Sequence, residues 1–288
     1  MAISGIAQRV YPLPVTLSVV IITCNEEANL PRTLESVKAL VSDGRGEIIV
    51  VDSGSTDRTV EIARSYGAKV FIEDWKGYAA QKNSAMEKAS GDWVLSLDAD
   101  ESLDTDLIEE LRGHSPDVRP YEWCLTMRGS AEAAKALDKP SGFWVRRKNF
   151  CLGRWIKYGG FWPDPKLRLF RRGAATFEDR LVHEDAKMEG TAGRLSGTLI
   201  HHSYPTLSDY IDHMNRYSSL GGEMAVAKGP RGFSVINIVL RPLATFVYNY
   251  FFRLGFLDGR EGLLLHLYHA VYVSWKYAKA WELAKKRG

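Results

Sequence analysis

The sequence predicts an α/β protein, a three-layer α/β/α sandwich with a helical appendage at its C-terminal end. Two observations support this prediction. Apolar runs of strand length alternate with helical patterns over residues 17–97, which is typical of a largely parallel sheet with helices on both faces. The residues after 206 are apolar with helical spacing, so we expect them to form separate helices.

The alternation begins with Leu17–Ile22, a β-branched apolar run with the length of a buried parallel strand. Residues 28–40 then place Leu30 and Leu34 at helical spacing, and Pro31 is tolerated in the first turn of such a helix. The pattern recurs along the chain. The predicted strands span residues 17–22, 47–51, 69–72 and 93–97, and the predicted helices span residues 28–40, 58–66 and 78–89.

In Rossmann-like sheets of this kind, ligands bind beyond the carboxyl ends of the strands. Loops that begin at Thr23, Asp52 and Asp98 each follow a predicted strand. Because parallel strands end at one edge of the sheet, these three polar or acidic loops should lie together. The sequence therefore predicts a shared binding site at this edge.

The composition excludes several classes of protein. The chain has 288 residues, of which 25% are charged and 45% hydrophobic, as in ordinary globular proteins and unlike disordered or polytopic membrane proteins. The net charge of +3 gives no support to a nucleic-acid-binding protein.

The cysteines and the N-terminal residues indicate the compartment. Cys24, Cys124 and Cys151 show neither metal-ligand spacing nor a disulfide pattern, which fits a reducing cytosol. Arg9 and Pro12 interrupt the apolar residues near the N-terminus, so we expect no cleavable signal peptide. The substrates should then be met on the cytosolic side.

Asp98 and Asp100 lie two positions apart directly after the predicted strand 93–97. Both carboxylates can project towards one pocket, where oxygen ligands suit Mg²⁺ or Mn²⁺ and the metal would bridge pyrophosphate oxygens. The competing interpretation is that they are acidic surface residues at the start of a helix near Thr105.

Asp52 also follows a buried strand, and it precedes a glycine-containing turn and a helix N-terminus. Its carboxylate could accept hydrogen bonds from a uracil or a ribose. The competing interpretation is a strand-end turn in which Asp57 caps the next helix.

Four motifs occur in order within residues 15–105: VVIITCNEE at 19–27, VVDSGSTD at 50–57, QKNSA at 81–85 and GDWVLSLDADE at 91–101. In order, spacing and strand context the chain resembles a family 2 glycosyltransferase. The resemblance implies the A-type glycosyltransferase fold, a nucleotide-sugar donor, a divalent metal ion and inversion at the anomeric carbon.

The resemblance also assigns roles to individual positions. The expected donor contacts are Thr23, Asn25, Glu27, Asp52, Lys82, Asn83 and Asp98. Asp100 would hold the metal ion, which would neutralise the charge that develops on the nucleoside diphosphate as it leaves. The chain departs from the common pattern at Ser53, where many members have aspartate, and at Lys82, where arginine is common.

An inverting transfer needs a base that deprotonates the acceptor hydroxyl. Residues 177–185 form an acidic cluster that resembles a His-Glu segment of a lipopolysaccharide-core subgroup of the family, which implies Glu184 as the base and Asp185 as its rival. The alternative for this cluster is a solvated acidic turn. At the end of a short strand-like run, His202, beside His201, is a candidate metal or diphosphate ligand, with a structural histidine as the alternative.

The predicted organisation has four parts: residues 1–14 as an N-terminal extension, 15–125 as the nucleotide-sugar-binding half, 126–205 as the acceptor-binding half and 206–288 as a helical, membrane-associating region. Short strand-like pieces at 123–127, 167–170 and 199–202 lie in the second half or at its border. The basic aromatic stretch 144–158 suits a phosphorylated or sugar acceptor, although it could equally be ordinary surface.

Two apolar stretches follow, at 235–252 and 263–283. Arg241 and Pro242 interrupt the first, which makes a membrane-spanning helix less favourable than one that lies in the interface or packs on the protein. The second ends in a basic cluster that suits anionic lipid head groups, with an oligomer interface or a helical lid as the alternative. With the subgroup resemblance, these stretches predict a peripheral enzyme on the cytoplasmic side of the bacterial inner membrane.

The prediction for function is thus a metal-dependent, inverting transfer from a nucleotide sugar, expected to be UDP-linked, to a lipopolysaccharide-core or lipid-linked glycan. A nucleotidyltransferase of sugar phosphates is one alternative, but it usually needs a glycine-rich phosphate loop after the first strand, where this chain has Asn25-Glu26-Glu27. An inactive, membrane-bound glycan-binding protein is the other.

Overall fold

The computed structural model describes residues 16–42, 44, 46–112, 140–178, 185–229 and 232–287. The described chain forms two compact units. The first contains the residues up to 147, together with 165–178 and 185–200. The second contains residues 148–164, 201–229 and 232–287. The strand-like piece predicted at 123–127 lies outside the described residues.

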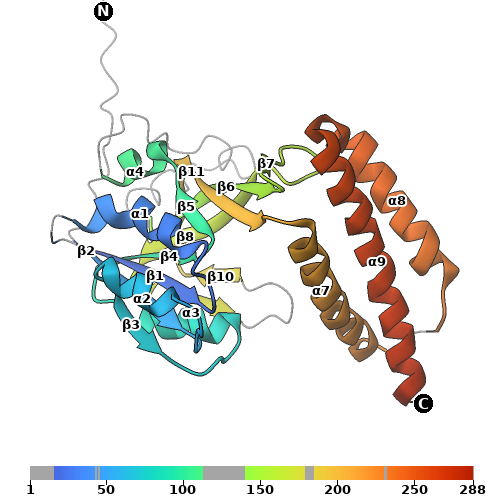
Figure 1. Ribbon diagram of the computed structural model, residues 1–288, viewed down its shortest axis with the longest axis horizontal. Helices are drawn as coiled ribbons and strands as arrows, with labels where there is room; N and C mark the ends of the chain where they lie inside the picture. Colours follow the sequence, from blue (N-terminus) through green and yellow to red (C-terminus); the bar gives the residue numbers. More distant parts are fainter. Residues whose placement is uncertain are drawn as a thin grey trace, which may run out of the picture. The chain divides into compact units, whose positions relative to one another are not determined.

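The elements are labelled in Figure 1. The strands are β1 (Leu17–Thr23), β2 (Gly46–Asp52), β3 (Lys69–Ile72), β4 (Trp93–Asp98), β5 (Glu101–Leu103), β6 (Gly142–Cys151), β7 (Arg154–Trp155), β8 (Asp164–Arg171), β9 (Ala175–Glu178), β10 (Asp185–Met188) and β11 (Ala192–Tyr204). The helices are α1 (Leu30–Val41), α2 (Thr59–Ser65), α3 (Tyr78–Glu87), α4 (Thr105–Leu111), α7 (Leu207–Ala227), α8 (Arg241–Val247) and α9 (Gly259–Arg287). Three shorter segments are the π-helical η1 (Ile236–Leu240) and η2 (Tyr248–Phe252) and the 3-10 helix η3 (Gly255–Asp258).

Among the described residues, one sheet has the strand order β3-β2-β1-β4-β8-β6-β11-β5, and β7 pairs with β6. The pairs β1–β2, β1–β4 and β2–β3 are parallel, as the strand–helix alternation predicts. The pair β4–β8 is antiparallel, so the sheet is mixed. Parallel pairing needs a crossover connection, usually a helix, between the two strands. The alternation of strands and helices that supplies such connections ends after β4.

The first unit has helices on both faces of its sheet, since successive side chains of a strand point to opposite faces. Val19 and Ile21 of β1 belong to one buried cluster with Leu34 of α1. Val20 belongs to a second buried cluster with Ala85 of α3. Helices α1 and α3 therefore lie on opposite sides of β1 (Figure 1). The predicted three-layer α/β fold with C-terminal helices is confirmed.

The second unit is built around α7 and α9. Helix α7 begins with a capping box in which Thr206 Oγ1 accepts from the backbone N–H of Asp209 and the Asp209 carboxylate accepts in return. A side chain at Gly222 would meet the backbone nitrogen of Ala280 at 3.3 Å, so glycine lets α7 approach α9 closely. Within the described residues, no helix is long and apolar enough to cross a membrane.

Candidate active site at the carboxyl edge of β1, β2 and β4

The strand register brings the three predicted loops to one edge. Thr23 at the end of β1 lies opposite Asp52 at the end of β2, and Ile22 lies opposite Asp98 at the end of β4. The hydroxyl of Thr23 donates to Asp52 Oδ2 at 2.9 Å. The edge therefore collects the polar groups that the sequence places after separate strands.

Asp52 is fully buried and shapes the turn that follows β2. Its Oδ1 accepts from the backbone N–H groups of Gly54 at 3.0 Å and Ser55 at 2.8 Å. Its Oδ2 accepts from the hydroxyls of Thr23 and Ser55. Gly54 has φ +82, a conformation that glycine adopts without strain. Because a carboxylate accepts about four hydrogen bonds, a nucleoside group that contacts Asp52 would have to displace one of these donors.

The loop after β1 is joined to the loop after β2 by side-chain hydrogen bonds. The Asn25 backbone N–H donates to Ser55 Oγ at 2.8 Å, and Asn25 Oδ1 accepts from the Thr56 N–H at 2.8 Å. Glu27 Oε2 accepts from the backbone N–H of Arg58 at 3.1 Å. Asn25 has φ +56, a region in which asparagine is enriched among non-glycine residues. The two loops thus form one surface, on which Asn25 and Glu27 are exposed.

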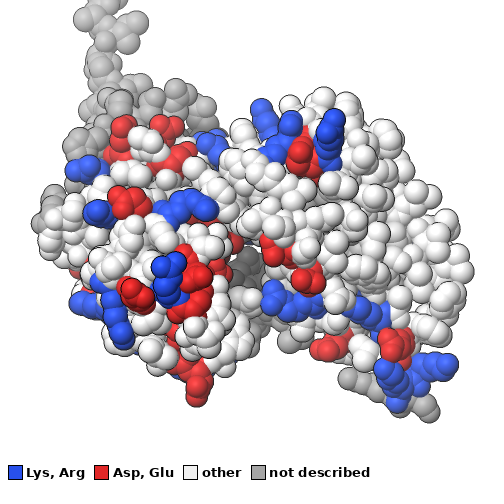
Figure 2. All heavy atoms as spheres, in the orientation of Figure 1, with Lys and Arg blue, Asp and Glu red and all other residues white. Residues whose placement is uncertain are grey.

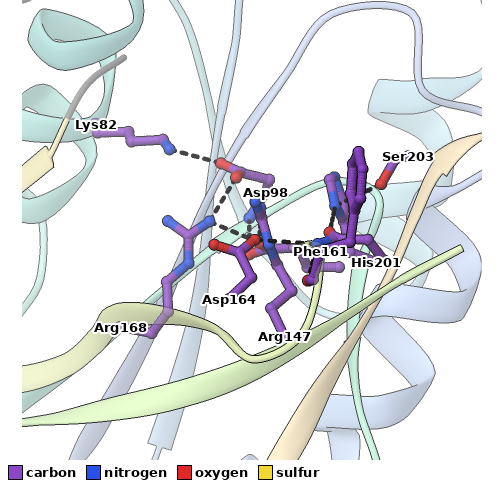
Figure 3. A network of polar contacts seen from close by, with 10 residues as sticks. Lys82, Asp98, Arg147, Phe161, Asp164, Arg168, His201 and Ser203 are labelled. Atoms are coloured by element: carbon purple, nitrogen blue, oxygen red, sulfur yellow. Dashed lines mark hydrogen bonds and ion pairs between the residues drawn. The ribbon is translucent and has the colours of Figure 1, made fainter. Parts of the chain in front are cut away.

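Asp98, at the end of β4, is at the centre of a network of charged side chains that also come from α3, β5, β6 and β8 (Figure 3). Lys82 Nζ on α3 is 2.7 Å from Asp98 Oδ1, and Arg168 Nη2 on β8 is 2.6 Å from Asp98 Oδ2. The same Arg168 nitrogen is 2.7 Å from Glu101 Oε1, which also accepts from Arg147 Nη1 at 2.9 Å. The edge therefore carries three cations and two carboxylates in one connected cluster.

This cluster keeps Asp98 ionised. Burial by itself would raise the pKa of Asp98, but the charges of Arg168 and Lys82 outweigh it and hold that pKa well below its ordinary value. Burial likewise would lower the pKa of Arg168, but Asp98 and Glu101 raise it above its ordinary value. Lys82 and Arg168 are 2% and 4% exposed, so their charges act with little screening by water.

Asp100 lies on the acidic side of this edge and is half-buried. Burial raises the pKa of Glu26, a hydrogen bond from Asn29 lowers it, and the negative charges of Asp100 and Asp98 raise it further. A divalent cation beside Asp100 would relieve this repulsion, so the donor chemistry fits Mg²⁺ or Mn²⁺. Among the described side chains, however, no three acidic, histidine or cysteine groups converge into a complete metal cage.

The other predicted site residues have varied surroundings. The amide of Asn83 binds both backbone groups of Phe177 in β9, because it donates to the Phe177 carbonyl at 2.9 Å and accepts from the Phe177 N–H at 2.8 Å. Glu184 lies outside the described residues. Asp185 begins β10, opposite Glu178, and its side chain also lies outside the described part.

The histidines belong to the second unit. The ring of His202 stacks on Phe150 with the centroids 5.5 Å apart. His201 Nδ1 is 2.7 Å from both Asn149 Oδ1 and Ser203 Oγ, in a chain of polar contacts that reaches Asp164 through the Asn149 amide at 3.1 Å. Figure 3 shows the side chains of His201 and Ser203 close together.

Sequence reasoning missed Arg168, Arg147 and the role of Glu101. Arg168 stands within the apolar run Leu167–Phe170, and arginine is almost never fully buried without a partner. A cation in a predicted buried strand was therefore a usable signal that it pairs with a carboxylate. Which carboxylate it meets could not be read from the sequence, because 70 positions separate Arg168 from Asp98.

The fold and the site define an α/β protein whose sheet gathers polar loops and a charged cluster at its carboxyl edge, where ligands of such sheets bind. A sequence model of the family described as "Glycosyl transferase family 2" matches residues 18–175. The chain belongs to this family and is a glycosyltransferase enzyme.

Full-length relatives agree with the family. The chain is 31% identical over 278 residues to a lipopolysaccharide core biosynthesis glycosyltransferase, LpsC, of Rhizobium meliloti, with 92% of each chain covered. It is 30% identical to an uncharacterized glycosyltransferase of Rickettsia typhi, over 94% of this chain and 88% of the relative. A solved structure of the mannosyltransferase PcManGT from Pyrobaculum calidifontis, in complex with GDP-Man and Mn²⁺, is similar at 18% identity and TM-score 0.47, covering 98% of this chain and 78% of the other.

Proposed function

We propose that the protein is an inverting, metal-dependent glycosyltransferase that moves a sugar from a UDP-linked donor to a lipopolysaccharide-core or lipid-linked glycan. One observation carries this proposal more than any other. The register of β1, β2 and β4 places Thr23, Asp52 and Asp98 at a single edge, where Lys82 and Arg168 supply buried positive charge.

The donor would lie along this edge. The joined loops that carry Asn25 and Glu27 offer exposed polar groups to the nucleoside, and Asp52 holds their turn in place. The charged cluster brings the buried cations Lys82 and Arg168 to this edge, and positive charge suits the anionic diphosphate. In this arrangement Lys82 and Asn83 face the diphosphate or ribose, and Asp98 contacts the ribose or the sugar.

The leaving nucleoside diphosphate acquires negative charge as the glycosidic bond forms. Asp100 would hold Mg²⁺ or Mn²⁺, and the ion would supply neutralisation of that charge. In the second unit, His202 stays a separate candidate for a metal or diphosphate ligand. The buried cations Lys82 and Arg168 add to this stabilisation.

The acceptor hydroxyl would be deprotonated by Glu184, with Asp185 as the rival base. Its oxygen then forms a bond to the anomeric carbon from the face opposite the diphosphate, and the bond from that carbon to the diphosphate breaks, which inverts the configuration. The basic aromatic residues 144–158 would bind a phosphorylated or glycan acceptor.

We also place the enzyme peripherally on the cytoplasmic side of the inner membrane. A lipid-linked acceptor requires the enzyme to work at a membrane surface. The similarity to a lipopolysaccharide core biosynthesis enzyme over 92% of the chain supports this location.

The donor and the metal are tested by ligand-induced thermal stabilisation with UDP-sugars in the presence and absence of Mn²⁺, since only a ligand that prefers the folded state raises Tm. We expect stabilisation by a UDP-sugar that depends on Mn²⁺. Asp100→Asn should abolish that dependence and lower turnover by about 10²- to 10³-fold, which corresponds to the several kcal/mol that such an ion supplies.

The matched control is Asp106→Asn, which removes the same charge from an exposed position in the first turn of α4. Its activity should stay within about twofold of the wild type, because a helix-end charge contributes only a few tenths of a kcal/mol. Full metal-dependent activity in Asp100→Asn would contradict the metal assignment.

The base is tested by comparing Glu184→Gln with Asp185→Asn. Loss of a general base lowers kcat by about 10²- to 10⁴-fold. We expect this loss in Glu184→Gln, with donor binding preserved in the thermal assay. If Asp185→Asn alone lost activity, the base would be Asp185.

A further inference from the structure

An exposed apolar face runs along the segment 235–252 of the second unit. Val235, Ile236, Val239, Leu240 and Leu243 lie at positions i, i+1, i+4, i+5 and i+8, which share one side of a helix. Each of them is more than half exposed, with Ile236 at 65%. Soluble proteins rarely leave so many large apolar residues together in water unless they mark an interaction site.

Aromatic side chains extend this face through η2. Tyr248, Phe251 and Phe252 are 58%, 53% and 75% exposed. We call the eight residues from Val235 to Phe252 named in these two paragraphs the apolar face. Figure 2 shows a broad area without charged side chains over α8, with charged side chains gathered near its ends.

The other side of this segment is held against α9, so the apolar face cannot turn inwards. The Ser274 hydroxyl donates to the Ile238 carbonyl at 2.8 Å. The guanidinium of Arg241 donates to the Tyr277 hydroxyl and lies over the Tyr277 ring, 5.1 Å from its centre. The exposure of the apolar face is therefore fixed by contacts within the second unit.

Within the segment that carries the apolar face, the exposed charges have one sign. Between residues 233 and 260 the sequence has a single carboxylate, Asp258, and it is buried, where it accepts from the backbone N–H groups of Lys157 and Tyr158. Arg241 and Arg253 are exposed in the same stretch, and Arg260 follows directly. The apolar face thus adjoins exposed cations and no exposed anion of its own segment.

We propose that the apolar face docks on an anionic lipid surface, with its helix in the plane of the bilayer interface. The proposal rests on the membrane location given above and specifies the surface that makes the contact. The apolar side chains would enter the boundary between head groups and acyl chains, and the exposed Arg253 and Arg260 would meet lipid phosphates. Arg241 in the middle of the segment, together with the absence of a membrane-spanning helix among the described residues, agrees with an in-plane position.

Charge decides between a lipid surface and a second copy of the chain. A two-fold pairing of this face would place its arginines near those of the partner without a carboxylate of the segment to oppose them. An anionic bilayer supplies both the apolar phase and the missing negative charge.

The experiment is sedimentation of the full chain with vesicles, either of phosphatidylcholine alone or of phosphatidylcholine with a quarter phosphatidylglycerol. We expect binding to the anionic vesicles that weakens at least about tenfold with phosphatidylcholine alone or at high salt. The double variant Ile236→Ser/Phe252→Ser should weaken binding to anionic vesicles at least about tenfold, because it removes two large apolar side chains from the lipid phase.

The matched control is Ile72→Ser on β3, where the isoleucine is 62% exposed in the first unit. It should bind vesicles like the wild type. Unchanged binding of the double variant, or failure of the wild type to bind anionic vesicles, would overturn the proposal. It would also fall if the wild type were a dimer in solution that the double variant dissociates, because a second copy would then occupy the face.

The same samples separate this proposal from the proposed function. Thermal stabilisation by UDP with Mn²⁺ reports on the donor edge and needs no membrane. If a sample shows that stabilisation but no vesicle binding, only the docking surface is wrong. If vesicle binding occurs without nucleotide stabilisation, the donor assignment fails and the docking surface stands.

Discussion

The two units bury ionisable side chains in opposite ways. In the first, Lys82, Arg168 and Glu101 are almost fully buried and each charge has an oppositely charged partner within 3 Å. In the second, His266 is 1% exposed, and neither ring nitrogen has a hydrogen-bond partner. Paired charges can remain ionised in a protein interior, whereas an unpaired imidazole remains there only in its neutral form.

The surroundings of His266 explain why it stays neutral. A side chain at Gly159 or Gly255 would lie 2.0 or 2.3 Å from the ring, so the imidazole fills a slot between two glycines. Phe161 packs beside it, with ring centroids 5.8 Å apart. Burial, followed by the nearby His269, lowers the pKa of His266 to about 4. The comparison teaches that buried charges in the first unit are matched by opposite charges, whereas the neutral imidazole of the second unit is held by packing.

The largest expected effect comes from breaking the charged cluster. Arg168→Met removes one cation and leaves Asp98 and Glu101 with fewer partners, and loss of one partner from a buried ion pair costs about 3–5 kcal/mol. The measurement is the free energy of unfolding in urea at pH 7, with circular dichroism to confirm folding.

The control is Arg171→Met on the same strand, where the exposed guanidinium lies 4.9 Å from the Trp93 ring centre. This change should cost less than about 1 kcal/mol. Arg168→Lys, which keeps the positive charge, should recover part of the loss. If Arg168→Met and Arg171→Met lowered the free energy of unfolding equally, the cluster would contribute no more stability than an exposed arginine.

The second effect is a pH dependence of the free energy of unfolding that arises from His266 in the second unit. The folded-state pKa of His266 is about 4 against an ordinary value of 6.5. Its contribution to stability is therefore complete above pH 6.5 and is lost as the pH falls towards 4, by about 3 kcal/mol in total. Asp98, whose pKa is also lowered, keeps its contribution until the pH falls below the ordinary carboxyl range.

The measurement is the free energy of unfolding at pH 7.5 and at pH 4.5, for the wild type and for His266→Gln. In the variant, the free energy of unfolding should differ much less between pH 7.5 and pH 4.5 than it does in the wild type. A difference of the same size in both proteins would assign the pH dependence to other groups.

The smallest of the three effects tests the tightness of the slot. Gly159→Ala places a methyl group against the His266 ring and also strains a residue with φ +65. Gly153 has φ +79 and open space around it, so Gly153→Ala carries the backbone strain alone. We expect thermal or urea unfolding to show that the Gly159 variant is less stable than the Gly153 variant by about 2 kcal/mol. Equal stabilities would mean that the ring moves aside freely.

Local pattern was enough to predict most of the elements of the first unit. The predicted strand 69–72 coincides with β3, and the predicted strand 17–22 differs from β1 by one residue. Both follow from short runs of β-branched and other apolar residues, a pattern that depends only on neighbours in sequence. The strand-like piece predicted at 167–170 lies within β8, but its antiparallel pairing with β4 was not predicted, since that pairing depends on a distant return of the chain.

The sequence by itself determined the α/β class, the family and the edge at which Thr23, Asp52 and Asp98 meet, because the alternation of strands and helices decides where parallel strands end. The tertiary structure decided which charges pair there. Arg168 reaches Asp98 across 70 positions. The tertiary structure also decided which side of residues 235–252 is exposed, because that exposure depends on the packing of the segment against α9. Such long-range contacts depend on three-dimensional packing, which the spacing of residues along the chain does not encode.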